Sequence, residues 1–504
     1  MSFLFVNRKP SSAFAKVISA YKTINEDIVG GQSVYYAYDS SIWGDVPVIE
    51  KNGKSLLLSG WFILDDKLND INLLHDEIIL NGLENAQSKI QAGIFTAIFF
   101  DSTATSDEFT IFQDPASLLP HYWTQEKSEL VVTPECGEII SSEDTCLTEI
   151  LVKKGHLFGD NTIDKQVKKI LPFEHLVIKR QVVKKVDNSK TFHDYVFGGV
   201  RHEDFFDSFK KVNRPLKPDV CALSAGFDSR LIAHRFDPSA FYTWGPKHSQ
   251  DVIVAEKISN NKEKPHFSFS FTDEFVNDID DEVCCALFKG SVLNPNARFL
   301  CNYRKVKNEF KSSVFSLDGY LGDVLQRGTY NNFKGTLGEF LKIFPKFYDY
   351  LNISDRYVLR SRYRELGEKD FDMLWEDYKK KTDILCDEDP YTKVTFYEFF
   401  YGRGGRYIST GGIVMNSLFF NVVPAFCSKS SLNYFFNQKM TDALEFKTFK
   451  KVWSDIDDEA IVELNSEGGY SSKTPRVLIP LMNFLGRLNT RFNPRRKNYS
   501  RGGR

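Results

Sequence analysis

Short apolar runs alternate with polar turns over roughly the first 185 residues of the chain. The runs are rich in β-branched and aromatic side chains, a composition that favours strands. We expect strands at residues 54–64, 93–101, 108–114, 128–134 and 174–186. Residues 72–90 instead place their apolar side chains at helical spacing. Strands mixed with one or two helices predict a layered α+β domain in this part of the chain.

The pattern changes from about residue 196 onward. Buried strands are expected at 220–224, 240–245, 264–271 and 312–319. Helices are expected at 229–236 and at 250–261, the second with Ser249 as its N-cap. Because strands alternate with helices, this half predicts an α/β domain with a parallel, doubly wound sheet, and its remainder from about 335 is largely helical. The polar residues 185–194 predict a linker that divides the chain into domains 1–190 and 196–504.

The turn at residues 224–229 carries the most chemistry. In a doubly wound sheet, ligands bind beyond the carboxyl ends of the strands, where this turn is expected. Gly226 allows a sharp bend, Ser224 and Ser229 offer hydroxyl donors, and the helix that follows directs its amino end at the same place. Together they predict a phosphate cradle, in which Asp228 implies a magnesium ion between carboxylate and phosphate. The alternative is an ordinary helix start capped by Asp228 or Ser229.

Composition and charge narrow the classes of function only slightly. The net charge of -2 gives no argument for nucleic acid or a membrane surface, and no apolar run is long enough to span a bilayer. Eight cysteines without a CxxC pair argue against structural zinc and for reduced thiols. We see no signal peptide, so we expect a cytoplasmic protein. The basic stretch from Gly486 is either a solvated tail or a contact for an anionic partner.

The turn resembles the SGGxDS loop of the ATP-pyrophosphatase (PP-loop) superfamily, with Ala225 in place of one glycine. Residues 241–258 resemble the second strand and helix of that superfamily, which implies adenine contacts near Thr243 and Gly245. Residues 314–328 resemble the SGEGGDELFGG loop of asparagine synthetases, with matches at Gly319, Gly322 and Asp323. The resemblance implies that ATP binds here with Mg²⁺ held by Asp228 and Asp323.

The first half resembles the class II glutamine amidotransferase domain of the same family, which is an Ntn-hydrolase-like sandwich. The matching positions are Gly93, Phe95, Ala97, Asp101, Asp114, Pro115, Pro120 and Tyr122. The chain has Ser2 where the family has its cysteine nucleophile, and Leu64 where an asparagine helps to form the oxyanion hole. An apolar side chain cannot donate to an oxyanion, so we expect a domain without glutaminase activity. Ammonia then comes from solution or a partner, or another amine is the nucleophile.

Three later residues are candidates for catalysis. Tyr320 stands where β-lactam synthetases have a tyrosine paired with a glutamate, for which Glu398 is the candidate here, and the resemblance implies that this pair activates an amine. Lys473 stands about where the family has a lysine that stabilises charge. The alternatives are a packing aromatic, a solvated helix acid and a solvated loop lysine. Arg403 and Arg406 are candidates to clamp a substrate carboxylate.

The resemblance implies an asparagine synthetase-like ligase that adenylates a carboxylate, releases pyrophosphate and lets an amine or ammonia attack. Its partners would be a small-molecule, peptide or sugar carboxylate and an amine donor, with a homodimer left open. Alternatives are an intramolecular cyclase similar to β-lactam synthetases or lasso-peptide cyclases, and an inactive nucleotide-binding regulatory protein. An enzyme acting on tRNA would suit the basic tail, but the near-neutral charge and the missing cysteine motif for sulfur transfer disfavour it.

Overall fold

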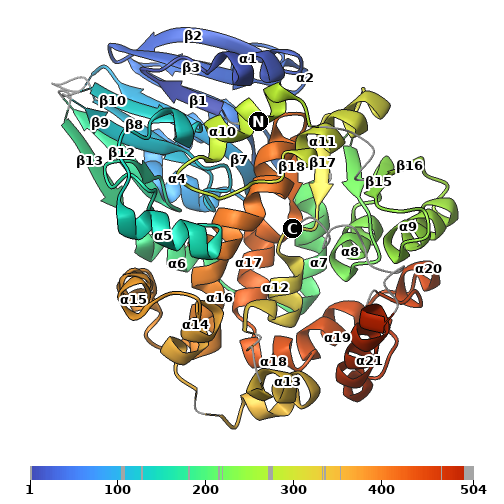
Figure 1. Ribbon diagram of the computed structural model, residues 1–504. Helices are drawn as coiled ribbons and strands as arrows, with labels where there is room; N and C mark the ends of the chain where they lie inside the picture. Colours follow the sequence, from blue (N-terminus) through green and yellow to red (C-terminus); the bar gives the residue numbers. More distant parts are fainter. Residues whose placement is uncertain are drawn as a thin grey trace.

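The computed structural model describes residues 3–103, 108–126, 129–179, 182–213, 216–217, 219–270, 276–331, 333, 336–351, 353–466 and 468–492. Ser2 and the last part of the basic stretch, residues 493–504, lie outside the described residues. Antiparallel strands occupy one side of the molecule, and a parallel sheet with most of the helices occupies the other (Figure 1). No helix within the described ranges combines the length and the apolar character needed to cross a membrane.

Two antiparallel sheets form the first half. The six-stranded sheet has the order β11-β9-β10-β1-β3-β2, and the seven-stranded sheet has the order β13-β12-β8-β7-β5-β4 with β6 added beside β5. The strands of the first sheet are β1 (Phe3–Val6), β2 (Thr23–Val29), β3 (Gln32–Tyr38), β9 (Tyr122–Glu126), β10 (Glu129–Thr133) and β11 (Lys168–Lys169). Those of the second are β4 (Val48–Lys51), β5 (Lys54–Leu64), β6 (Lys67–Leu68), β7 (Ala92–Asp101), β8 (Glu108–Gln113), β12 (Glu174–Lys179) and β13 (Val182–Asp187).

The two sheets pack face to face through every second side chain. The shared core contains Leu4, Val6, Val34 and Tyr36 from one sheet and Leu57, Ile98, Ile111 and Leu176 from the other. The opposite face of the first sheet meets α1 (Ser12–Ser19), where the Phe14 ring lies 4.9 Å from the Phe3 ring. The opposite face of the second sheet is covered by α3 (Ile71–Asn81) and α4 (Leu83–Lys89). The period-2 pattern of the strands therefore produces a four-layer arrangement, helix–sheet–sheet–helix.

The predicted strands of this half are confirmed as β5, β7, β8 and β10, and residues 174–186 divide into β12 and β13. The predicted helix at 72–90 divides at Gly82, whose φ of 81° is left-handed. Strand β2 was not predicted because its sequence, TINEDIV, lies at a sheet edge with mostly exposed side chains. An edge strand of this kind needs no apolar alternation.

The linker predicted at residues 185–194 is wrong. Residues up to Asp187 belong to β13, and α6 (Ser189–Phe197) follows almost at once. Phe192 packs at 5.6 Å from the Phe173 ring and at 4.8 Å from the Phe400 ring. The polar residues that suggested a linker lie on the outer side of a packed connection.

The second half is built on a parallel sheet with the strand order β16-β15-β14-β17-β18. Its strands are β14 (Asp219–Ala222), β15 (Ala240–Trp244), β16 (His266–Phe269), β17 (Phe315–Asp318) and β18 (Asn421–Pro424). The helices near them are α8 (Phe227–Arg235), α9 (Gln250–Asn261), α10 (Asp278–Phe288) and α11 (Arg298–Glu309). The four predicted strands are confirmed, as is the Ser249 cap, which accepts from Val252 N at 3.3 Å. The order reverses between β14 and β17, so these two strands flank the switch point where α/β sheets bind ligands.

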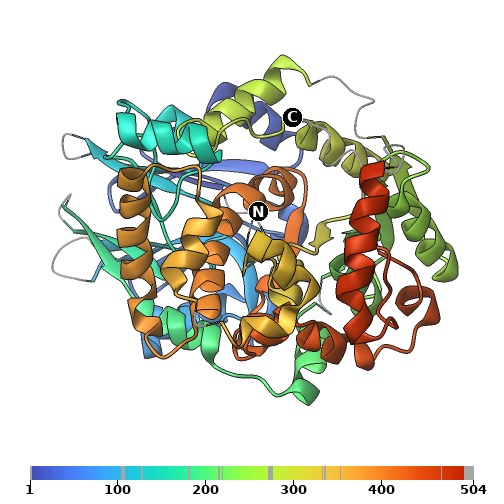
Figure 2. The ribbon, with the colours of Figure 1, turned by 60° about the horizontal axis from the view of Figure 1, so that its bottom comes forward.

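Helices make up most of the remaining chain. They are α2 (Ser40–Trp43), α5 (Thr145–Lys154), α7 (His202–Asn213), α12 (Gly322–Arg327), α13 (Thr336–Ile343), α14 (Asp355–Arg362), α15 (Glu368–Thr382), α16 (Pro390–Phe400), α17 (Lys429–Phe436), α18 (Met440–Leu444), α19 (Lys447–Ser454), α20 (Glu459–Val462) and α21 (Ile479–Phe492). Two π-helical turns, Gly404–Ile408 and Thr410–Met415, follow α16. Figure 1 shows α14 to α16 below the antiparallel sheets, and in Figure 2 the red helix α21 lies at the right of the molecule.

Strand β18 joins the two halves. The Lys22 ammonium, which is fully buried, lies 2.9 Å from an Asp39 carboxylate oxygen and donates to the Asn421 side-chain oxygen at 3.4 Å. The Asn421 amide donates to Asp39 at 2.9 Å, which closes the triangle. Trp61 Nε1 donates to the Val422 carbonyl at 3.1 Å. The edge of the parallel sheet is thus fixed to the antiparallel half by three hydrogen bonds, two of which involve the buried Lys22–Asp39 ion pair.

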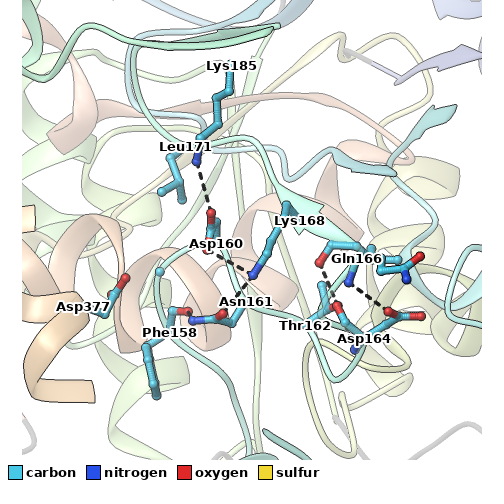
Figure 3. Close-up of polar contacts among 12 residues, drawn as sticks. Phe158, Asp160, Asn161, Thr162, Asp164, Gln166, Lys168, Leu171, Lys185 and Asp377 are labelled. Carbon is cyan, nitrogen blue, oxygen red and sulfur yellow. Dashed lines mark hydrogen bonds and ion pairs between the residues drawn. The ribbon is translucent and has the colours of Figure 1, made fainter. Parts of the chain in front are cut away.

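A second junction involves Arg406, one of the residues predicted to clamp a substrate. Its guanidinium is buried and donates to the Gly159 carbonyl at 3.0 Å and to the Asn161 carbonyl at 2.6 Å. The accepting loop is itself fixed by ion pairs from Lys185 and Lys168 to Asp160, at 3.2 and 3.7 Å (Figure 3). Arg406 therefore holds the halves together, and it does not line the main cavity described below, so it is not placed to clamp a substrate carboxylate there.

The Lys22–Asp39 pair gives a test of this junction. Asp39→Ala leaves the buried ammonium without its carboxylate, so we expect the free energy of unfolding at pH 7 to fall by about 3–5 kcal/mol in urea unfolding. Asp45→Ala, at an exposed carboxylate, is the control and should change it by less than about 0.5 kcal/mol. An equal effect of the two substitutions would contradict the role of the pair.

The same ion pair predicts how the stability of the protein changes with pH. Burial raises the pKa of Asp39, but the Lys22 ammonium and the hydrogen bonds outweigh burial and hold the pKa well below its ordinary value of 3.8. The pair's stabilisation is therefore complete above pH 3.8 and is lost as the pH falls below it. We expect the stability difference between wild type and Asp39→Ala to shrink on acidification, measured by urea unfolding at several pH values.

Candidate active site

The turn after β14 is held closed by its own hydroxyl groups. Ser224 Oγ and Ser229 Oγ lie 3.0 Å apart, and Ser224 Oγ accepts from Gly226 N at 3.1 Å. The amide of Ala225 donates to Asp251 Oδ1, at the start of α9, at 2.8 Å. Helix α8 begins at Phe227, two residues before the predicted start, so its free amide groups face the turn. The turn thus gathers hydroxyls and amide donors at the amino end of a helix.

Gly226 does not act as predicted. Its φ is −66°, a value open to any residue, so the turn needs no left-handed glycine there. Space is the tighter constraint, because a Cβ at this position would lie 3.0 Å from Ser224 Oγ. Glycine therefore lets the Ser224 hydroxyl approach the backbone closely.

A cavity of about 460 Å³ opens at the carboxyl ends of β14, β15 and β17. One part of its lining is polar and comes from the turn, with Ser224, Gly226, Asp228 and Ser229. Another part is aromatic, with Tyr242, Trp244, Phe299 and Tyr407. We call this the main cavity. Its volume suits a nucleotide-sized ligand, with flat rings for a base and donors for phosphates.

Thr243 and Gly245 lie where the strand β15 reaches this cavity. Thr243 lines it, and its hydroxyl donates to the Leu223 carbonyl at 2.6 Å. Gly245 is outside the lining and donates its amide to the Phe269 carbonyl at 2.8 Å. Trp244, which was not predicted, is the side chain between them that faces the cavity.

Asp228 receives two donors that the sequence analysis did not predict. Gln326 Nε2 donates to its Oδ1 at 2.6 Å, and the Arg327 guanidinium lies 3.4 Å from its Oδ2. Both donors stand on α12, three and four residues after Asp323, and this spacing places them on the same helix face as Asp323. Their position near Asp228 could therefore have been predicted from the sequence. Burial raises the pKa of Asp228 to about 7, which Arg327 opposes and the Asp323 charge increases.

Asp323 and the glycines of its loop support the predicted arrangement. Gly319 and Gly322 lie against Asp228, since a Cβ at Gly322 would come within 2.8 Å of its Oδ1. Asp323 is near enough to act on the charge of Asp228, and its own carboxylate accepts from Thr329 Oγ1 at 3.0 Å. The structure therefore brings the two predicted magnesium ligands into one neighbourhood.

These residues fit a magnesium ion only together with phosphate. Within the described part of the chain, no three His, Cys, Asp or Glu side chains group as a metal site. The Asp228 carboxylate has about four lone-pair sites, which is more than the side-chain donors from Gln326 and Arg327 occupy. Two carboxylates completed by phosphate oxygens and water suit Mg²⁺, which rarely uses an all-protein cage.

Tyr320 and Glu398 are not brought together. The Tyr320 ring lines the main cavity, but its hydroxyl donates to the Gly404 carbonyl at 2.6 Å. Glu398 is fully buried and accepts from Arg362 Nε and from Arg403 N, both at 2.9 Å. Burial alone would raise the pKa of Glu398, but the Arg362 charge and hydrogen bond lower it. Glu398 is thus an ionised, structural partner of Arg362 in this conformation.

Lys473 lies away from the main cavity. Its side chain is exposed in the loop after Ser472, outside the cavity lining. Arg327 is instead the cation that contacts Asp228. The ring of Phe227 lies beneath Arg327 at 5.8 Å, which fixes the guanidinium near the turn.

Asp318 lines the main cavity at the end of β17. Burial raises its pKa to about 6, against a backbone hydrogen bond from Tyr320 that lowers it. No ion pair reaches this carboxylate from any residue that the structure describes. Gly412 faces it, and a Cβ there would lie 3.6 Å from both oxygens, so space remains beside the carboxylate.

The geometry is therefore a donor-rich turn at a topological switch point, an aromatic wall, and carboxylates at Asp228, Asp318 and Asp323. Such a site can bind a nucleotide and, through Asp318, a cation. No protein-family model matches the chain, and no curated protein matches it.

Proposed function

We propose that the chain is a PP-loop synthetase, similar to asparagine synthetases, that adenylates a carboxylate with ATP. The observation that best supports this is the Ser224–Ser229 turn, with its paired hydroxyls, at the switch point of a parallel sheet. Its donors and the start of α8 suit a pyrophosphate group, and the aromatic wall at Trp244 suits an adenine ring. The antiparallel half is then the Ntn-hydrolase-like domain of the same family.

The proposed reaction has two steps. A substrate carboxylate oxygen attacks the α-phosphorus of ATP, and the bond to the β-phosphate oxygen breaks to release pyrophosphate. An amine in its unprotonated form then attacks the activated carbonyl carbon, the bond from that carbon to the AMP oxygen breaks, and AMP leaves as the amide forms while the proton lost by the nitrogen passes to the Asp318 carboxylate. Ser224, Ser229 and the amides of the turn bind the leaving pyrophosphate, and Arg327 balances its charge near Asp228. Mg²⁺, held by Asp228 and Asp323, would neutralise the charge that develops on the phosphate oxygens.

The amine is the part of the substrate that Asp318 suits. Asp318 is half-buried and lines a cavity without a protein cation, so it suits a cationic ligand, because a partly desolvated charge is costly unless it is paired. We therefore assign amine binding to Asp318 instead of the Tyr320–Glu398 pair, whose members are satisfied elsewhere. This arrangement favours an amine nucleophile over ammonia from a glutaminase half. Leu64, buried in an apolar cluster, supports the absence of glutaminase activity.

A nucleotide-binding regulatory protein is the second candidate. Gln326 and Arg327 already satisfy Asp228, and Trp453 Nε1 donates to Gln326 Oε1 at 3.1 Å, which holds the amide in place. A carboxylate satisfied in this way is less available to a metal. This observation favours ATP binding without turnover.

Exchange of labelled pyrophosphate into ATP separates the two candidates. Over a panel of aspartate, uronic acids and peptide acids, we expect exchange that depends on one class of acid. Ser224→Ala should lower the exchange rate about 100-fold, because one donor to the leaving group is lost, and Asp228→Ala should abolish it. Ser454→Ala, at an exposed hydroxyl, is the matched control. ATP binding without exchange for any acid would favour the regulatory protein.

Asp318→Asn tests the amine site. Only the ionised carboxylate binds a cation, so the affinity of wild type for the amine should rise as pH increases through about 6. Asp318→Asn should weaken amine binding about 10- to 100-fold and remove this pH dependence, with ATP affinity unchanged. Asp281→Asn, at an exposed acid of α10, is the control. An unchanged pH profile in Asp318→Asn would exclude the assignment.

A further inference from the structure

A second cavity, of about 260 Å³, lies between the two halves of the chain. Helix α5 lies on the same side of the molecule as α14 and α16 in both ribbon views (Figures 1 and 2). The cavity lies between the end of α5, the 3-10 turn Thr329–Asn331, the end of α14 and the segment after α16, and its lining includes Lys154, His156, Thr329, Tyr330, Arg362 and Arg403. None of these residues lines the main cavity.

The lining carries an excess of positive charge. Three cations, Lys154, Arg362 and Arg403, stand in it. Lys154 is paired with Glu365 at 3.1 Å, and Arg362 with Glu398 at 2.9 Å. The Arg403 guanidinium has no carboxylate partner among the described residues, since only its backbone amide reaches Glu398. His156 adds no charge near neutral pH, because burial lowers its pKa to about 4.

Tyr330 also lines the second cavity, and it carries a buried polar group without a partner in the part of the chain that the structure describes. Its side chain is 6% exposed, yet its hydroxyl finds no hydrogen-bond partner among the described residues. An unsatisfied buried hydroxyl is unfavourable, so such groups in native structures usually contact a ligand or water. The Arg362 guanidinium covers one face of the ring at 4.7 Å, so the ring itself is fixed.

We propose that this second cavity binds the anionic group of a small molecule, a carboxylate or a phosphate. The Arg403 guanidinium supplies a planar pair of donors that matches either anion, and the Tyr330 hydroxyl supplies a further donor. Arg403 is placed for this role because its guanidinium stacks on the Tyr407 ring, 5.1 Å from the centroid. The prediction from sequence that Arg403 clamps a carboxylate is thus moved out of the main cavity.

The inference does not depend on the proposed reaction, but the two cavities are neighbours. Tyr407, which supports Arg403, lines the main cavity. Thr329, which lines the second cavity, donates to Asp323. An anion in the second cavity is therefore close to the candidate nucleotide site at two places, through Tyr407 and through Thr329.

Calorimetric titration of the full chain, without nucleotide, tests the inference with inorganic phosphate and with malonate. We expect saturable binding of at least one of them. Arg403→Gln should weaken it at least 10-fold, and Tyr330→Phe about 3- to 10-fold. Arg360→Gln, an arginine of α14 paired with Glu368 outside the cavity, is the matched control and should bind as wild type does. Tighter binding of phosphate or of malonate identifies the chemical class of the ligand.

Two further measurements keep the test decisive. Tyr330→Phe without anion should unfold at the same temperature as wild type or higher, because the removed hydroxyl has no partner; a lower temperature would mean a structural hydroxyl and would overturn the proposal. Ser224→Ala should still bind the anion. Loss of binding in Ser224→Ala would place the anion in the main cavity and overturn the inference, as would an absence of binding for both anions.

Discussion

The buried contact between Lys22, Asp39 and Asn421 is the interaction on which the position of the candidate site depends. Asn421 begins β18, and β18 pairs with β17 in parallel register from Phe315 to Asp318. Strand β17 in turn ends at Asp318 and delivers the loop that packs against Asp228. The charges of the antiparallel half therefore fix the edge strand, the edge strand fixes its neighbour, and the neighbour fixes the loop over the turn.

Through these contacts the antiparallel half positions the candidate site, a structural role that requires no catalytic residue in that half. Arg406 and Trp61 add buried hydrogen bonds across the same boundary, and they run in opposite directions between the halves. A junction of this kind fixes the orientation of one half relative to the other. It also explains why the connection at residues 185–197 is packed and not a free linker.

The sequence was sufficient to predict those parts of the candidate site whose residues lie close together in the chain. Strand, turn and helix at 220–235 lie within sixteen residues, so the turn, its hydroxyls and its helix could be predicted together. Contacts that depend on tertiary packing could not be predicted in this way. Glu398 is buried beside Arg362, 36 residues earlier in the chain, and no spacing rule connects the two. Strand β18 was missed because its short apolar run lies among aromatic residues in a region whose periodicity is helical.

The ring of Tyr407 lines the main cavity and also stacks with the Arg403 guanidinium, which lines the second cavity. This contact makes the two cavities thermodynamically linked whenever an occupant of one shifts the ring or the cation stacked on it. Linkage of this kind is reciprocal: any factor by which an anion changes nucleotide affinity is the factor by which the nucleotide changes anion affinity. If both proposed ligands bind, Tyr407 is the side chain that connects the two occupied cavities.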